Sequence, residues 1–411
     1  MRSIRLVAIG LSMLVVAGTA FAEGGLEGSG SSCSWPRFRG PDGDGTVTAG
    51  AFTLRDRDIP GAPAWVVDIG AGYSTPAIVD GRVYTLGNAR GQDTVRCLRV
   101  EDGRQLWSYS YSAGTGGYPG PRATPTVQDG RVYTLSRDGT LLCLNAQDGS
   151  RIWQRNITRE YGAQQPGWDY ASSVVVWNDL LLINVNSSGM AVSKSSGTLV
   201  WNSRSAAAGY ATPVVAEIAG RTQALFFTES GLHGVDPATG TQFWSYDWVT
   251  DCGVNAADPV PFGNRILISS GYGHGSATIE ISGTRARTVW SSHIIESQVS
   301  SLIYHDGYVY GNDGSAGSGR SYFRCIDPNT GRERWSAQAS GMGSLIAVGP
   351  YLVLFTERGR LTLAELTPDA YRPVAEMQAP RGTYWAAPVL CGNRLFLRDT
   401  NGSLVCYQFG R

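Results

Sequence analysis

The sequence predicts an all-β protein, an eight-bladed β-propeller of four-stranded antiparallel blades closed by an N-terminal strand that completes the last blade. Three observations predict this fold. A tryptophan recurs at nearly regular spacing, short alternating runs are separated by Asp-Gly turns, and each end of the repeat region holds only part of one blade. Glycine is abundant and no long stretch shows helical periodicity, which fits an all-β chain rich in tight turns.

The tryptophans that mark the repeat each close a short phrase that begins with glycine. They are Trp107, Trp153, Trp201, Trp244, Trp290 and Trp335. In the clearest repeat, residues 122–153, Asp-Gly pairs at 129–130, 138–139 and 148–149 divide four alternating runs. Such runs joined by Asp-Gly turns predict four antiparallel strands. We name these strands a to d, from the propeller axis outward.

The blades are expected to begin at equivalent positions before each strand a. These positions are Tyr73, Arg122, Tyr170, Tyr210, Ala256, Gln298, Gly341 and Trp385. Blade seven keeps its turns but lacks a tryptophan near Val374, and residues 386–409 supply only three strands of blade eight. Residues 64–68 have the form of an outer strand without its inner three, so Trp65 becomes the eighth blade's tryptophan. Joining the two chain ends in this way removes two free sheet edges.

The repeat frame resembles a known family. Its order of Thr-Pro, Asp-Gly, strand, Asp-Gly, strand and glycine phrase with tryptophan resembles the pyrroloquinoline-quinone-like (PQQ-like) repeats of quinoprotein dehydrogenases and of the propeller lipoprotein in the bacterial outer-membrane barrel-assembly machinery. The leader at residues 35–41, Trp-Pro-Arg-Phe-Arg-Gly-Pro, is similar to one that precedes the propeller in exported members. The resemblance implies that the repeat tryptophans dock between blades, each burying about 150–250 Å².

The N-terminus predicts export. Basic Arg2 and Arg5 precede an apolar run and small residues, which is typical of a signal peptide over residues 1–22 that is cleaved near Ala22. We therefore expect a periplasmic or secreted protein with an N-terminal arm over residues 23–60 and a single propeller domain over residues 61–411. The apolar run is shorter than the about 20 residues of a membrane span.

The balance of charge bears on the binding partners, and the positions of the cysteines bear on the possible disulfides. Lys plus Arg number 34 and Asp plus Glu number 34, so the sequence predicts no nucleic-acid partner, and we expect a monomer. Four cysteines fall at one strand-c position that demands a small residue: Cys97, Cys143, Cys325 and Cys406. Equivalent positions on adjacent blades lie about 10 Å apart, too far for a disulfide. Cys33, Cys252 and Cys391 remain as possible partners, and Cys33 with Cys391 is the candidate because the arm enters near blade eight's a–b turn.

Catalytic and metal motifs are not found in the sequence. The four histidines, His233, His274, His293 and His305, fall on different blades without metal-like spacing, and residues 42–45 read as a glycine-rich turn rather than a calcium loop. The resembling dehydrogenases would imply PQQ and calcium, with a ligand set of Glu, Asn and Asp, a catalytic Asp and a pair of adjacent cysteines. No two cysteines are adjacent here. We therefore predict no cofactor and no metal.

The long loops predict which face is functional. Strand order puts b–c turns and d–a connections on one face, and the long glycine- and aromatic-rich segments all fall there: residues 113–121, 158–169, 247–255, 271–276 and 312–320. The blade-start positions should ring the axial mouth on this face. Its predicted binding residues are Tyr73, Arg122, Tyr170, Tyr210, Gln298 and Trp385.

Two functions remain open from the sequence. One is an exported, non-enzymatic scaffold or binding protein of the cell envelope that holds a protein partner or small ligand at the long-loop face. The other is a quinone- and calcium-dependent oxidoreductase with its cofactor at the propeller axis. In the first case the tyrosines of the mouth contribute to binding, whereas a purely structural role would have them plug the channel.

Overall fold

The structure is a computed structural model that describes residues 33–47, 60–114, 118–317 and 320–409. The predicted signal peptide and its cleavage near Ala22 lie outside the described residues. The described residues form one compact unit by their contacts. In the described ranges, no helix is both long and apolar enough to cross a membrane.

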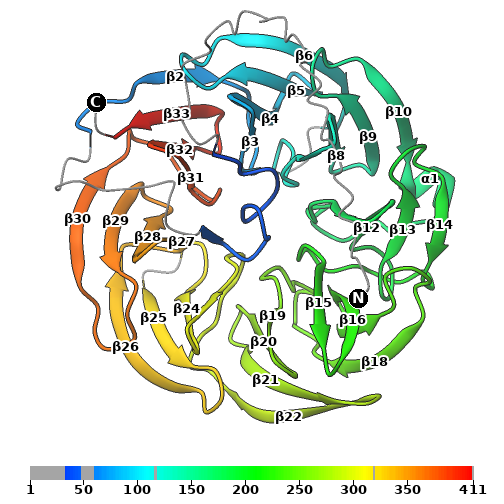
Figure 1. The fold of residues 1–411 in the computed structure, drawn as a ribbon, viewed down its shortest axis with the longest axis vertical. Coiled ribbons are helices and arrows are strands. Elements are labelled where there is room, and N and C mark those ends of the chain that lie inside the picture. The colour runs from blue at the N-terminus through cyan, green and yellow to red at the C-terminus, as the bar shows by residue number, and fades with distance from the viewer. Residues whose placement is uncertain (1–32, 48–59, 115–117, 318–319, 410–411) are drawn as a thin grey trace, which may run out of the picture. The chain divides into compact units, whose positions relative to one another are not determined.

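The described strands form eight antiparallel sheets that follow one another around a common axis (Figure 1). Each sheet contains strands a to d of one blade in that order, and the a strands of most successive blades contact each other. Blade one contains β3 (Ala77–Val79), β4 (Arg82–Ala89), β5 (Gln92–Arg99) and β6 (Gln105–Ser112), and blade two contains β7 (Thr126–Gln128), β8 (Arg131–Leu135), β9 (Thr140–Asn145) and β10 (Arg151–Asn156). Blade three contains β11 (Val175–Trp177), β12 (Leu180–Ile183), β13 (Met190–Ser193) and β14 (Leu199–Asn202), and blade four contains β15 (Val214–Ile218), β16 (Arg221–Thr228), β17 (Gly231–Val235) and β18 (Gln242–Asp247).

Blades five to eight repeat the same order, and the last takes its outer strand from the N-terminal part of the chain. Blade five contains β19 (Val260–Phe262), β20 (Arg265–Ser270), β21 (Gly275–Ser282) and β22 (Arg285–Ser292), and blade six contains β23 (Ile303–His305), β24 (Tyr308–Asp313), β25 (Ser321–Asp327) and β26 (Arg332–Ala339). Blade seven contains β27 (Gly343–Val348), β28 (Tyr351–Thr356), β29 (Arg360–Glu365) and β30 (Pro373–Gln378), and blade eight contains β31 (Val389–Cys391), β32 (Arg394–Arg398), β33 (Ser403–Gln408) and β2 (Trp65–Asp68).

The closing strand confirms the predicted eight-bladed propeller. β2 pairs antiparallel with β33, so that Trp65 lies opposite Cys406 and Asp68 opposite Ser403. The indole N–H of Trp65 donates to the carbonyl of Val100 in blade one at 2.9 Å. The N-terminal strand therefore belongs to the last blade and also contacts the first, which joins the ends of the repeat region.

The repeat tryptophans link each blade to the next. Trp107 of blade one donates to the carbonyl of Ala146 in blade two at 3.0 Å, and its ring covers Gly149 in the same turn. A Cβ at Gly149 would lie 2.5 Å from that ring, so the turn requires glycine. Trp153, Trp201, Trp290 and Trp335 donate in the same way to the following blade. Trp244 is the exception, because its indole N–H donates to Gln223 in its own blade.

The strand-c register explains the four buried cysteines. Cys97, Cys143, Cys325 and Cys406 each lie directly opposite the tryptophan of their blade. At the same position in blade four, a Cβ on Gly234 would approach the ring of Trp244 to 2.3 Å, so only a small side chain fits beneath the indole. All four cysteines are free, as expected, and burial raises the pKa of Cys143 to about 11. Their role is packing, because a buried thiol behaves as a small apolar group.

One short helix lies in a connection that the sequence predicts as a loop. α1 (Ile157–Tyr161) follows β10, and the side chain of Asn156 accepts a hydrogen bond from the backbone N–H of Arg159. Gly162 ends the helix in the left-handed conformation, with a φ of 68°. An Asn N-cap and a Gly C-cap are sufficient to form a single turn. A turn this short leaves no periodicity in the sequence.

Residues 33–47 of the N-terminal arm cross the axis and contact the inner strands around it (Figure 1, dark blue at the centre). Trp35 bridges to Ile78 of blade one, and the carbonyl of Pro36 accepts from the N–H of Val127 in blade two. β1 (Thr46–Val47) then adds a parallel fifth strand to the inner edge of β27 in blade seven. The sequence predicts the leader but not this path.

A buried ion pair fixes the middle of the arm. Arg39 lies 3.5 Å from the carboxylate of Asp258 at the start of blade five, and it also donates to the carbonyls of Asp44 and of Leu302 in blade six. Both charged side chains are buried. Asp44 itself accepts from the N–H and hydroxyl of Thr46, at 2.8 Å each, as in a glycine-rich turn capped by its own side chain.

A disulfide between Cys33 and Cys391 attaches the start of the arm to strand a of blade eight, with the Cα atoms 5.3 Å apart. This is the predicted candidate pair, and it joins residues 358 positions apart in the chain. The arm therefore contacts blade eight covalently, blades one and two by backbone hydrogen bonds, and blade seven as a strand.

Replacing Cys33 by Ser should lower the free energy of unfolding by about 2–4 kcal/mol, because the disulfide restricts the unfolded chain over a long loop. Urea unfolding of the oxidised protein measures this. Cys252→Ser is the matched control, since Cys252 is free and exposed, and it should change stability by less than about 0.5 kcal/mol. Equal unfolding midpoints for wild type and Cys33→Ser would show that the arm is held without the disulfide.

Candidate binding site at the axial mouth

A belt of hydrogen bonds holds the starts of the inner strands in place. The backbone N–H groups of Thr75 and Thr124 donate to the side chains of Thr124 and Ser173 in the following blades, at 3.2 and 2.9 Å. In the same way, the backbone N–H of Ser173 donates to the side chain of Thr212, that of Thr212 to the carboxylate of Asp258, and that of Asp258 to the side chain of Ser301. The blade-start residues of blades one to six lie two or three positions before this belt and are thus held at the long-loop end of the axis.

Three of the predicted residues form the centre of the site. The rings of Tyr73 and Trp385 lie 5.5 Å apart, and the guanidinium of Arg122 lies over the Tyr73 ring at 5.7 Å. These residues begin blades one, eight and two, which are neighbours around the closure. We call Tyr73, Arg122 and Trp385 the collar.

The long loops add two exposed aromatic side chains to the collar. The Tyr118 ring stacks on Trp385 at 6.3 Å and meets the edge of Trp168 at 5.6 Å. Tyr118 is 43 % and Trp168 49 % exposed. The predicted residue Tyr210 joins them, because its hydroxyl accepts from the backbone N–H of Trp168 at 3.0 Å. The sequence signal for the added pair was their place in the two long d–a connections.

Asp169 orients the basic residues of the site. Its carboxylate lies 3.6 Å from Arg122 and 2.5 Å from Arg137, and both guanidinium groups also donate to the carbonyl of Tyr118. Burial lowers the pKa of Arg122, and the nearby Asp169 opposes that shift. Burial also raises the pKa of Tyr73, which Arg122 opposes. One carboxylate therefore serves two cations beneath the aromatic surface.

Two of the predicted residues lie away from the collar. Tyr170 is 2 % exposed in the core between blades two and three, where its hydroxyl bonds to Thr158 and to the carbonyl of Ala163, both at 3.0 Å. The side chain of Gln298 donates to the Tyr272 hydroxyl at 2.7 Å and accepts from the N–H of Ala316. The contacts of Tyr170 lie within its own connection, whereas Gln298 is held by the b–c turns of blades five and six.

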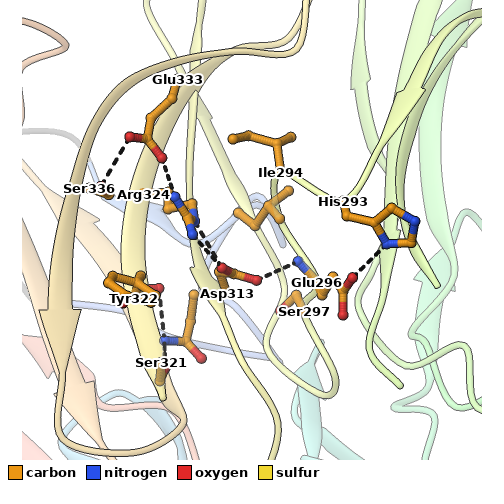
Figure 2. A network of polar contacts seen from close by, with 12 residues as sticks. His293, Ile294, Glu296, Ser297, Asp313, Ser321, Tyr322, Arg324, Glu333 and Ser336 are labelled. Carbon is orange, nitrogen blue, oxygen red and sulfur yellow. Dashed lines mark hydrogen bonds and ion pairs between the residues drawn. The ribbon is translucent and has the colours of Figure 1, made fainter. Parts of the chain in front are cut away.

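A polar network fixes the connection that carries Gln298 (Figure 2). The backbone N–H of Glu296 donates to Asp313 at 2.9 Å, and Asp313 is bound in turn by Arg324 on β25. On the other side, Glu296 meets the ring of His293 at 2.7 Å and accepts from the N–H of Gly273. These contacts connect blade five to blade six, and they give His293 a structural role.

A cavity of about 50 Å³ lies between the collar and the arm. Trp385 and Thr75 line it together with Trp35, Phe38 and Arg39 of the arm. Within the described residues, the indole N–H groups of Trp35 and Trp385 have no hydrogen-bond acceptor although both nitrogen atoms are buried. An unsatisfied buried donor costs about 1–3 kcal/mol. The cavity therefore presents donors that need an oxygen atom.

The axial cavity is small for the quinone that the resembling dehydrogenases carry. Among the described residues, no group of three or more His, Cys, Asp or Glu side chains could hold a metal ion. The side chains of Trp35, Phe38 and Arg39 border the axial cavity, which at about 50 Å³ is well below the about 300–1,000 Å³ of sites for drug-sized ligands. Asp258, an acid at the start of blade five, is paired with Arg39 of the arm.

The comparisons with known proteins agree with the fold. A family profile described as outer membrane protein assembly factor BamB matches residues 50–164 and 123–337. Among solved structures, BamB from Moraxella catarrhalis superposes with a TM-score of 0.61 at 16 % identity, covering 84 % of this chain and all of that one. A search of curated proteins finds no match.

Two further structures share the architecture at lower identity. A europium-containing methanol dehydrogenase has a TM-score of 0.55 at 10 % identity and covers 89 % of each chain. The computationally designed protein Ika8 has a TM-score of 0.59 at 12 % identity, covering 85 % of this chain and all of that one. At these identities the likeness concerns the fold alone. The profile match spans most of the chain, and the chain therefore belongs to the family of PQQ-like propellers described as outer membrane protein assembly factor BamB.

Proposed function

We propose that this chain is an exported, non-enzymatic binding or scaffold protein of the cell envelope that holds its partner at the axial mouth on the long-loop face. The observation that carries the proposal is the continuous aromatic surface from Tyr73 through Trp385 and Tyr118 to Trp168, with Arg122 lying over its first ring. Trp, Tyr and Arg side chains dominate the binding energy of protein interfaces.

The arm supports this choice of face. Both ends of its described part contact the inner strands at the side of the a–b turns: Cys33 is bonded to Cys391, at the end of strand a of blade eight, and Val47 pairs with Val348, at the end of strand a of blade seven. The collar lies at the opposite end of the same strands. The blade-to-blade belt already fixes the strand starts next to Tyr73 and Arg122, so less conformational entropy is lost there on binding.

The family supports a role in the envelope. The profile and the Moraxella structure are both named for BamB, an outer membrane protein assembly factor by its printed description. A partner protein is thus the favoured occupant. The dehydrogenase likeness gives the alternative oxidoreductase its basis in fold, and the described residues contain no group of three or more His, Cys, Asp or Glu side chains placed to hold a metal ion.

Substituting Arg122 and Trp385 together by Ala should reduce partner capture from envelope extracts at least tenfold, because the double change removes two contacts of about 1–2 kcal/mol or more. Mass spectrometry of proteins retained by the tagged mature chain measures the loss. Tyr304→Ala with Arg287→Ala is the control, since it removes an exposed aromatic and an exposed arginine elsewhere on the ring. If the mouth variant retains the same partners as wild type, the partner binds at another surface.

A further inference from the structure

The axial mouth presents hydrogen-bond donors in excess of acceptors. Trp385 belongs to the collar, yet its buried indole N–H has no acceptor among the described residues, and the same holds for Trp35 on the other side of the cavity. Trp35 is 1 % exposed, so bulk water does not reach its ring. Since an indole nitrogen can only donate, each needs an oxygen atom placed in the cavity.

A buried guanidinium lies just beneath the collar. Arg398, at the end of β32, is 1 % exposed and donates to the carbonyl and hydroxyl of Ser74, at 2.9 and 2.5 Å, and to the carbonyl of Gly70. These partners are uncharged, and the Nε–H of Arg398 has no acceptor in the described part of the chain. Ser74 follows Tyr73 of the collar in sequence, so this charge lies beside the collar, although Arg398 itself does not line the cavity. Burial lowers the pKa of Arg398 to about 10, which leaves it charged at neutral pH.

The carboxylates near these cations are already engaged. Asp169 is shared between Arg122 and Arg137. Asp399, next to Arg398 in sequence, accepts from the backbone N–H groups of Gly402 and Ser403 at 2.8 Å each. Asp93 accepts from Asn88 at 2.7 Å. Buried charges in proteins are usually paired. Asp399 and Asp93 lie near Arg398 and offset its charge, but the Nε–H of Arg398 and the two indole N–H groups still have no acceptor among the described residues.

We propose that the axial mouth binds a carboxylate group at the end of a narrow ligand, with the indole N–H groups of Trp35 and Trp385 as donors in the cavity and with Arg122 and Arg398 as cations beside the collar. The inference rests on the proposed binding function and names the chemistry that the site selects. A cavity of about 50 Å³ admits a carboxylate and little more. The rest of the ligand then lies on the aromatic surface of Tyr118 and Trp168.

Two sources supply this chemistry, the C-terminal carboxylate of a polypeptide and a small organic acid. The aromatic surface outside the cavity favours the first, because it offers contacts that a small acid does not use. Both predict that the charged oxygen atoms, and not the rest of the ligand, are required for entry.

The test uses the mature protein and an acetylated tetra-alanine peptide, with either a free C-terminal carboxylate or a C-terminal amide, and sodium propionate as the small acid. Isothermal titration calorimetry and the change in tryptophan fluorescence follow binding. We expect saturable binding of the free acid and at least tenfold weaker binding of the amide, the ratio for one charged hydrogen bond. Propionate should compete with the peptide.

Trp385→Phe keeps the ring and removes the N–H donor, and it should weaken binding of the free acid about tenfold. Trp177→Phe, at the end of strand a in blade three, is the matched control. An unchanged melting temperature shows that either variant is folded.

Equal affinity for the acid and the amide would overturn the carboxylate inference. The carboxylate inference would also be overturned if none of the three probes binds although the double variant of Arg122 and Trp385 still loses its envelope partner. In that case the proposed binding function stands. Tight binding of propionate without added affinity from the peptide supports a small organic acid as the source.

Discussion

Deletion of residues 61–70 is expected to abolish the cooperative unfolding transition rather than trim a tail. The deletion removes β2 and with it the strand that pairs with β33 over four residues. It also removes Trp65, whose ring covers Gly103 of blade one and whose N–H donates to Val100. A buried tryptophan alone is worth about 3–5 kcal/mol, and the whole native state of a typical domain about 5–15 kcal/mol.

Circular dichroism during thermal unfolding measures this result. Trp65→Ala should lower stability by about 3–5 kcal/mol, while Val66→Ala on the same strand should have little effect because Val66 is 53 % exposed. A deletion variant with the melting temperature of wild type would show that the ring closes without β2.

Arg39→Met should lower the free energy of unfolding by about 3–5 kcal/mol, because it leaves the carboxylate of Asp258 buried without its cation. Asp258 is 3 % exposed and retains only hydrogen bonds, one of them from the N–H of Thr212 at 2.8 Å. The double variant Arg39→Met with Asp258→Asn should be more stable than Arg39→Met alone, because it removes the unpaired charge and keeps an acceptor oxygen. Urea unfolding at about pH 7 measures all three, and additive losses would contradict the pair.

The pH dependence gives this pair a second signature. Burial raises the pKa of Asp258, and Arg39 opposes that shift. Without Arg39 the folded-state pKa rises further above the unfolded value of about 3.9. A raised folded pKa contributes stability at low pH that is lost as the pH rises through it. The deficit of Arg39→Met relative to wild type should therefore shrink on acidification from about pH 7 to about pH 4.5, and a constant deficit would show that Asp258 does not carry the charge.

The repeat could be predicted because its determinants are local. Each blade is a chain of hairpins, so Asp-Gly turns, alternating runs and the glycine before each tryptophan occur in order along the sequence. The cysteine register followed from the same counting, and the structure places each of these cysteines opposite its tryptophan. The closing strand was also predictable, because the N-terminal outer strand has no inner strands of its own and the C-terminal blade lacks an outer strand. Pairing the two completes one four-stranded blade.

The candidate site could be predicted only in part. Counting along the repeat identified Tyr73, Arg122 and Trp385, because equivalent positions of consecutive blades must lie around the axis. The direction of each side chain depends on the path of its connection, and Tyr170 instead bonds to Thr158 and Ala163 in its own connection. Tyr118 and Trp168 lie in long loops, where nothing in the sequence fixes which neighbour a ring meets.

The sequence by itself determined the number of blades, their register and the face that carries the long loops, since these follow from spacing within one repeat. Tertiary structure alone decided the course of the arm, the pairing of Arg39 with Asp258, and the unsatisfied donors of Trp35, Trp385 and Arg398. Those features depend on contacts between blades far apart in the chain, and Arg398 meets Ser74 across 324 positions. Ring closure brings such residues together, and no local pattern encodes which of them will meet.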